Sequence, residues 1–74
     1  MSGVRVEYNQ ENDSAYVYLT EIATGEAVRQ VEVDDDELGH SIVIDLDKHG
    51  HVLGFEFPYD ASLILPRELL DGLR

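Results

Sequence analysis

The chain has 74 residues, the length of one domain, and we expect a single domain over residues 1–74. It contains no cysteine, which excludes disulfides, thiolate nucleophiles and zinc–cysteine sites. Sixteen Asp and Glu residues oppose five Lys and Arg residues, giving a formal net charge of −11. Because such a surface repels phosphate backbones and anionic membranes, we expect no nucleic-acid or membrane binding, whereas a basic partner protein is favoured.

The sequence also predicts where the protein resides. No stretch approaches the roughly 20 apolar residues that a membrane-spanning helix needs. The first ten residues, MSGVRVEYNQ, contain no apolar run of signal-peptide length. The lack of cysteine suits a reducing compartment. We therefore expect a cytoplasmic protein, and its 43% hydrophobic residues predict that it folds.

Apolar residues alternate with polar ones along the first half of the chain, which is typical of β-strands. Two segments, 4–8 and 15–20, alternate in this way, and the polar turn 9–13 separates them. A third strand is expected over 28–33. Because Val28 is out of phase with the later valines, this strand is predicted to begin with a bulge or an early bend.

The middle of the chain predicts a β-hairpin. The four adjacent carboxylates of Asp34–Glu37 repel each other and resist burial, so they predict a solvated loop. Two alternating strands, 42–46 and 53–57, then flank the sequence Asp47–Gly50, which suits a tight turn. Gly54 lies inside the second strand, where glycine often marks a bulge or the close approach of another group.

The C-terminal segment predicts helix. Residues 60–62 suit a single helical turn, and Pro66 suits the first position of a short helix that stops near Gly72. Three leucines of this helix are expected to cover the sheet: Leu69, Leu70 and Leu73. The predicted fold class is α+β, an antiparallel β-meander of about five strands with one short C-terminal helix.

The alternation also predicts two faces for the sheet. One face would be buried and would hold Val4, Val6, Ala15, Val17, Leu19, Ile42, Ile44, Leu53 and Phe55. The opposite face would hold Tyr16, Tyr18, Val43 and Val52. Because one short helix cannot cover both faces, we expect self-association, as a homodimer with these four residues at its interface. The alternative is that they are ordinary strand formers on a half-exposed face.

Two segments together resemble a known family. Tyr8–Leu19 is similar to the opening of domain-of-unknown-function family 2283, with its acidic turn, alanine and aromatic strand, although Asn9 stands where an aspartate is frequent. Ile44–Phe57 is similar to the family's hairpin, and Asp60–Ser62 to its continuation. The resemblance implies a small β-rich fold, no established activity and no catalytic residue to carry over. In size and charge the family also resembles the antitoxin-like partners of toxins, which is an analogy only.

One motif is a near-match to a calcium loop, formed by Asp45, Asp47, His49, Gly50 and Glu56. A calcium loop must curl so that its twelfth residue returns to the first. Here the residues before Glu56 form an extended strand, which places Glu56 opposite Ser41 or Ile42 and far from Asp45. The motif therefore predicts a hairpin turn and not a calcium site.

Histidines give a second metal hypothesis. His49 and His51, with Asp45 and Asp47, are the candidate ligands, because imidazole and carboxylate groups bind zinc or nickel. His40 lies on the partner strand, several residues away in register, so we expect the three side chains not to converge. No metal and no cofactor are predicted.

Catalytic patterns are missing. No serine lies in a nucleophile-elbow context, and no glycine-rich phosphate loop is present. Glu56, between Phe55 and Phe57, is the one carboxylate set in an apolar strand, and we expect it to form a cross-strand hydrogen bond or an interface contact. We therefore expect no enzyme but an acidic protein-interaction module. The alternative is a metal- or small-ligand-binding domain that uses the turn Asp45–His51.

Overall fold

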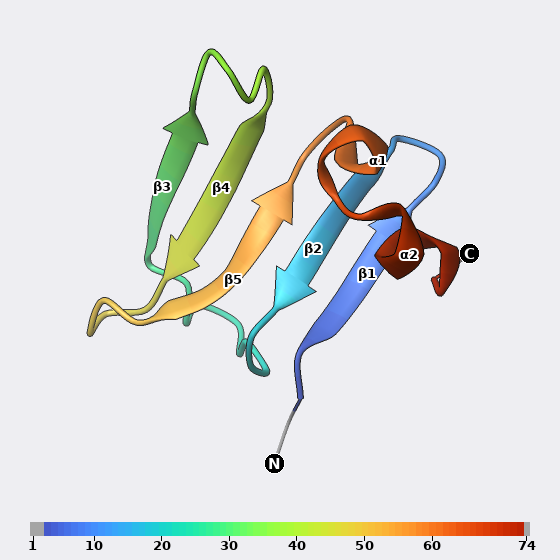
Figure 1. The fold of residues 1–74 in the computed structure, drawn as a ribbon. Coiled ribbons are helices and arrows are strands. Elements are labelled where there is room, and N and C mark those ends of the chain that lie inside the picture. Colours follow the sequence, from blue (N-terminus) through green and yellow to red (C-terminus); the bar gives the residue numbers. More distant parts are fainter. Residues whose placement is uncertain (1–2, 74) are drawn as a thin grey trace.

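The computed structural model describes residues 3–73 and contains a five-stranded antiparallel sheet followed by two short helices (Figure 1). The elements in chain order are β1 (Arg5–Asn9), β2 (Ser14–Tyr18), β3 (Arg29–Asp34), β4 (Ser41–Leu46), β5 (Val52–Phe57), α1 (Ala61–Ile64) and α2 (Arg67–Asp71). The predicted α+β class with five antiparallel strands is confirmed. The C-terminal segment forms two helices instead of one because Leu65, which precedes Pro66, is extended. Proline disfavours helical backbone at the preceding residue.

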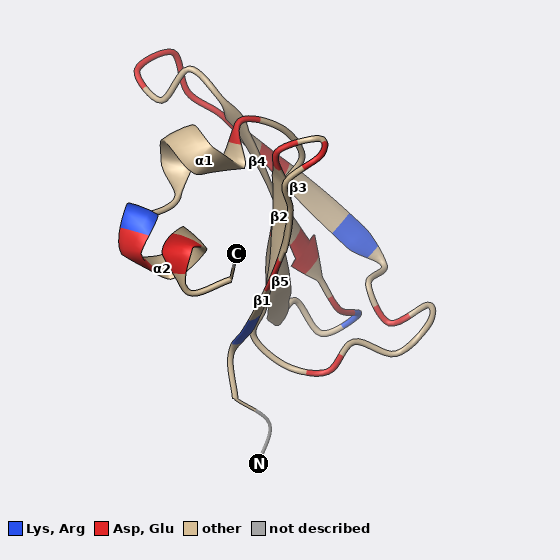
Figure 2. Ribbon diagram, turned by 90° about the vertical axis from the view of Figure 1, so that its right-hand side faces the viewer, with Lys and Arg blue, Asp and Glu red and all other residues tan. Residues whose placement is uncertain are grey.

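The strand order is β1-β2-β5-β4-β3, so β5 lies between β2 and β4. The segment between β2 and β3 crosses one end of the sheet on the side opposite the helices, as Figure 1 and Figure 2 show together. This connection leaves β1 and β3 at the two edges of the sheet.

The strand register aligns side chains into rows that cross all five strands, because directly opposed residues of an antiparallel pair share a face. The helices lie on one face, here called the helix face (Figure 2). Its central row is Val6, Val17, Phe55, Ile44 and Val31. The opposite face is here called the open face, and its two rows are Glu7, Tyr16, Glu56, Val43 and Glu32, and Arg5, Tyr18, Gly54, Asp45 and Gln30.

The core lies between the helices and the helix face. Ala61 of α1 packs with Ala15 and Phe57, and all three are buried. Leu70 of α2 is 1% exposed. Seven residues of the predicted apolar set lie in strands and share the helix face: Val6, Ala15, Val17, Ile42, Ile44, Leu53 and Phe55. Only Ala15 and Leu53 of these are buried, and Val4, outside the strands, is 67% exposed, so the prediction of a buried face is wrong for most of the set.

The helix α2 buries fewer leucines than the sequence predicts. Leu70 points into the core, whereas Leu69 and Leu73 are 37% and 40% exposed. A helix of five residues makes little more than one turn, so it presents about one residue to a flat surface. The prediction that three leucines cover the sheet is therefore wrong for two of them.

The turn between β1 and β2 anchors α1. The Asp13 carboxylate accepts hydrogen bonds from the Ser62 N–H (3.0 Å) and the Ser62 hydroxyl (2.6 Å), and the Asp13 carbonyl accepts one from the Ala61 N–H (3.0 Å). Asp60, at the N-cap position, makes no side-chain cap. Asp13 thus satisfies the helix N-terminus from 49 residues away.

The predicted hairpin turn and acidic loop are both present. Gly50 has φ 83°, which an L-residue rarely adopts, and closes the turn between β4 and β5. Asp34 ends β3, and the loop after it is ordered by the Asp35 carboxylate, which accepts the N–H groups of Glu37 and Leu38. The bulge or early bend predicted near Val28 corresponds to the start of β3: Val28 lies outside the strand, and its N–H donates to the carbonyl of Leu46, the residue that pairs with Arg29. A register shift also occurs between β4 and β5.

Candidate functional site

A buried carboxylate lies in the middle of the open face. Asp45 of β4 is 6% exposed and accepts hydrogen bonds from side chains of two other strands, β2 and β3. The Tyr16 hydroxyl donates to its Oδ2, and the Gln30 amide nitrogen donates to its Oδ1 at 2.9 Å. These bonds compensate the cost of removing the carboxylate from water. They also link β2, β4 and β3 across the open face.

Gly54 makes this network possible. The Tyr16 ring crosses β5 at Gly54 to reach Asp45 on β4. A Cβ atom on Gly54 would lie 2.6 Å from the Tyr16 ring and 2.6 Å from the Val17 carbonyl oxygen. The predicted close approach at Gly54 is therefore confirmed, and the approaching group is an aromatic ring.

The surroundings of Tyr16 keep its hydroxyl protonated. Burial raises the pKa of Tyr16 well above its ordinary value of 10.0, and the hydrogen bond to Asp45 and the charges of Asp45 and Glu56 raise it further. Tyr16 therefore remains a hydrogen-bond donor to Asp45 at neutral pH.

A second cluster joins β1 to this network. The Arg5 guanidinium lies 3.9 Å from the centre of the Tyr18 ring and 3.2 Å from the Glu7 carboxylate. The Tyr18 ring lies 4.5 Å from the Tyr16 ring, centre to centre. The hydrogen bond from Tyr18 lowers the pKa of Glu7, and the same bond raises that of Tyr18. The single cation of the two open-face rows is thus already paired.

Glu56 lies at the centre of the open face, between Tyr16 on β2 and Val43 on β4. It is half-buried and, within residues 3–73, its side chain makes no hydrogen bond or ion pair. The predicted cross-strand hydrogen bond is therefore absent. Its position opposite Val43, and not Ser41 or Ile42, corrects the predicted register by one residue. A shallow hollow beside it is lined by Glu7, Ser14, Tyr16 and Glu56, among others.

The structure brings together three of the four residues predicted at an interface. Tyr16, Tyr18 and Val43 all lie on the open face. Val52 pairs with Leu46 beyond the register shift and does not continue either open-face row, although it is 39% exposed. The open face is therefore more polar than the sequence predicts, because Glu7, Glu32, Asp45 and Glu56 share it with the tyrosines.

The calcium-like motif does not form a loop. Asp45 is held by Tyr16 and Gln30, and the Asp47 carboxylate accepts the N–H groups of His49 and His51 at 2.9 Å each. The backbone bond from His51 is the largest cause that lowers the pKa of Asp47, and the bond from His49 adds to it. The Asp47 carboxylate therefore stabilises the turn between β4 and β5 and is not directed at a metal site.

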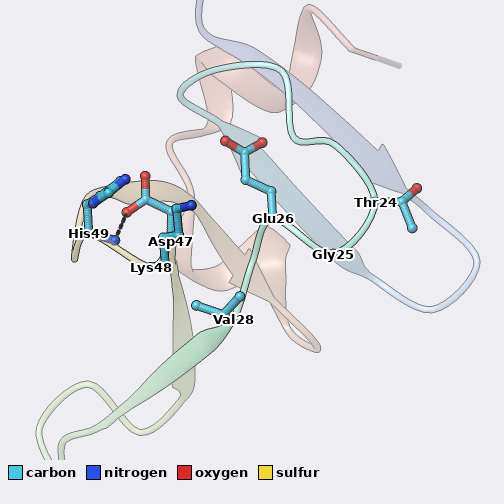
Figure 3. A pocket seen from close by; sticks show the side chains of 7 residues that line it. All are labelled: Thr24, Gly25, Glu26, Val28, Asp47, Lys48 and His49. Atoms are coloured by element: carbon cyan, nitrogen blue, oxygen red, sulfur yellow. Dashed lines mark hydrogen bonds between the residues drawn. The ribbon is translucent and has the colours of Figure 1, made fainter.

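The side chains that line the hollow beside this turn are also not arranged to bind a metal ion. It lies between the turn and the segment that joins β2 to β3 (Figure 3). In Figure 3 the side chains of Glu26, Asp47 and His49 do not converge on one point, and Thr24 points away. No group of three or more His, Asp or Glu side chains within residues 3–73 is placed to hold a metal ion.

The histidines lie apart, as the sequence predicts. The rings of His49 and His51 are 6.1 Å apart, centre to centre, and both residues are exposed at the turn. His40 lies at the opposite end of β4, where its Nδ1 is 3.3 Å from the Asp60 carboxylate. That nitrogen is buried and has no hydrogen bond of good geometry.

Comparison with known proteins identifies one family, whose function is unknown. The model of a family described as "Protein of unknown function (DUF2283)" matches residues 5–62. No curated protein and no solved structure matches the chain. In the part of the chain from residue 3 to residue 73, no helix is long and apolar enough to cross a membrane.

Proposed function

The chain belongs to the DUF2283 family, and for this member we propose a non-catalytic, cytoplasmic protein-interaction module that binds a basic partner through its open face. The observation that carries the proposal is that the Glu56 carboxylate is partly buried without a partner in the described part of the chain. This carboxylate is half-buried at the centre of the face and has no partner among the described residues, whereas Asp45 beside it has two.

A basic side chain is the group that fits this position. A half-buried carboxylate loses part of its hydration and gains most from a charge-assisted hydrogen bond, which Arg or Lys supplies. The Tyr16 ring lies next to Glu56 in the same row and offers an aromatic surface for a cation. The charge of −11 would also draw a basic partner toward the face.

The open face suits a different protein better than a second copy of the same chain. Two open faces placed together would oppose Glu7, Glu32 and Glu56 to the same three residues, and like charges across an interface cost binding energy. We therefore place Tyr16, Tyr18 and Val43 in a surface for a basic partner and not in a homodimer interface. An antitoxin-like role would be one instance of this binding.

The metal- or ligand-binding alternative has less support. Its central residues, Asp45 and Asp47, already accept hydrogen bonds from groups of the chain itself. His49 and His51 are exposed and do not converge with them. We do not propose this alternative.

The test compares two variants that remove one negative charge each. Glu56→Gln keeps the shape of the side chain and removes its charge. Glu68→Gln, on the exposed surface of α2, is the matched control because it lies on the other side of the sheet. Binding of an oligoarginine peptide is measured by calorimetry at physiological salt, where long-range attraction is screened.

The proposal predicts that Glu56→Gln weakens binding about tenfold, which corresponds to about 1.4 kcal/mol. Glu68→Gln should change it little. If both variants bind the peptide equally well, the interaction depends on net charge alone and the proposed site is wrong. Thermal unfolding of both variants checks the fold, because neither substitution removes a side-chain hydrogen bond or ion pair within residues 3–73.

A further inference from the structure

We propose that β3 is a dimerisation edge, where a second copy of this chain adds its own β3 antiparallel to form one continuous sheet. The edge strand β3 runs from Arg29 to Asp34, pairs with β4 without a register shift and has no strand on its other side. An edge of this kind presents a row of unpaired N–H and C=O groups. Proline and bulges, which often protect such edges, are absent from it.

The helix face at this edge is apolar and only partly covered, since Ile42 packs against the core cluster whereas Val33 is exposed. Both helices lie at the β1–β2 side of the sheet, away from β3 and β4 (Figure 1). The helix-face positions of these two strands hold one cation and no carboxylate: Arg29, Val31, Val33, Ile42, Ile44 and Leu46. Val33 is 37% exposed. In a chain with a charge of −11, this is a region where two copies approach without opposing their carboxylates.

The second edge of the sheet is a poorer candidate. The helix α2 lies beside β1, so the helix face at that edge is already occupied (Figure 1). The strand β1 is also shorter, with five residues against six in β3. A copy added at β1 would therefore extend the sheet without extending an uncovered apolar surface.

Charge selects the register of the β3 pair. A twofold axis perpendicular to the sheet pairs each residue of one β3 with a residue of the other β3. Because side chains alternate between the two faces along a strand, the paired residues share a face only if both residue numbers are odd or both are even. The register centred on Val31 places Val31 against itself, Arg29 against Val33 and Gln30 against Glu32. The register centred on Glu32 opposes Glu32 to Glu32, and like charges directly opposite are destabilising. The register centred on Gln30 pairs only residues 29–31 of the strand, whereas the register centred on Val31 pairs residues 29–33. We infer the register centred on Val31.

The polar side of this register is also complementary. Gln30 uses one amide hydrogen for Asp45, at 2.9 Å. A glutamine amide has two N–H donors, so the second is available to the Glu32 carboxylate of the other copy. On the helix face, the valines of the two copies would form one apolar stripe. This inference does not depend on the proposed binding of a basic partner.

Cysteine cross-linking tests both the edge and the register, because the chain has no cysteine of its own. In the inferred register the two Val31 Cα atoms are opposed at about 4.5–5.5 Å, within the range that a disulfide spans. Val31→Cys is therefore the test variant. Val33→Cys, which would oppose itself only two registers away, and Glu7→Cys, at the centre of the β1 edge, are the controls. Circular dichroism confirms that each variant is folded.

Under mild oxidation, Val31→Cys should form a covalent dimer at least about tenfold faster than either control, because pairing raises the local thiol concentration. Light scattering of the unmodified chain should give twice its mass of 8.3 kDa. A mass of 8.3 kDa at all concentrations would overturn the proposal, as would faster cross-linking of Val33→Cys or Glu7→Cys. Glu56→Gln should remain dimeric, which separates this test from that of partner binding.

Discussion

The two faces of the sheet are built from the same strands but are stabilised by different interactions. On the helix face, Ala15, Phe57 and Ala61 pack without polar partners, and burial of apolar surface supplies the stability. On the open face, Asp45 is buried by hydrogen bonds from Tyr16 and Gln30. The comparison indicates that burial of apolar surface stabilises the helix face, whereas hydrogen bonds to a buried carboxylate order the open face, which is the surface proposed above for binding.

The charges follow the same division. Figure 2 shows acidic residues in the strands, loops and helices, but the central helix-face row has none. The open-face rows contain four carboxylates and one arginine: Glu7, Glu32, Asp45, Glu56 and Arg5. A face that served stability alone would gain little from an unpaired carboxylate such as Glu56.

The largest expected effect is on the helix face. Phe57→Ala removes a ring that is 7% exposed and leaves a cavity between α1 and the sheet. We expect a loss of about 3–5 kcal/mol in the free energy of unfolding, measured by urea denaturation. Leu63→Ala, at a side chain that is 72% exposed, is the control and should cost far less. Equal losses would contradict the assignment of stability to the helix face.

The packing of the open face is tested by a substitution that adds a Cβ atom at Gly54. Gly54→Ala forces the Tyr16 ring and the Val17 carbonyl oxygen apart. We expect a loss of about 1–3 kcal/mol, typical of overpacking. Gly3→Ala, where nothing lies within 4 Å, should be close to neutral. A neutral Gly54→Ala would show that the Tyr16 ring does not cross β5 at this point.

The hydrogen bond to Asp45 is tested by Tyr16→Phe. This substitution removes the hydroxyl and leaves the buried carboxylate with Gln30 alone. We expect a loss of about 1–3 kcal/mol, because an under-satisfied buried group pays its desolvation cost. Tyr59→Phe is the control, since its hydroxyl donates a long bond of 3.3 Å to Ser41 and the residue is 49% exposed. Similar losses in both variants would contradict a special role for Asp45.

The smallest effect is expected at the turn, and it depends on pH. The pKa of Asp47 is lower in the folded chain than its ordinary value of 3.8, mainly because its carboxylate accepts the His51 N–H. Its stabilising contribution is therefore full above pH 3.8 and is lost as the pH falls through the lower folded value. Asp47→Ala should lower the melting temperature at neutral pH, and the difference should shrink in acid. A difference that grows in acid would contradict this account.

The local features of the fold could be predicted from the sequence. The hairpin of β4 and β5 follows from the alternation of apolar residues and from Asp47 and Gly50 in the turn, which act on their immediate neighbours. The division of Val17 and Tyr16 between two faces follows from the period of two. Helical turns near Ala61 and after Pro66 follow from the same kind of local signal.

The long-range features could not be predicted. The pairing of β2 with β5 joins segments that are far apart in the chain, and nothing in either segment specifies the other. The bonds from Asp13 to Ser62 and from Tyr16 to Asp45 depend on that pairing. Gly54 was the one available signal, because a glycine inside a strand indicates a close approach, but it does not identify the approaching ring.

The most direct test of the difference between the faces is a nuclear magnetic resonance titration of the isotope-labelled chain with an oligoarginine peptide. The account predicts that the largest chemical-shift changes fall on the open face, at the backbone amides of Tyr16, Val43 and Glu56. The exposed acidic loop after Asp34 provides the comparison within the same sample. Changes confined to that loop, or spread evenly over both faces, would contradict the claim that the open face is the binding surface.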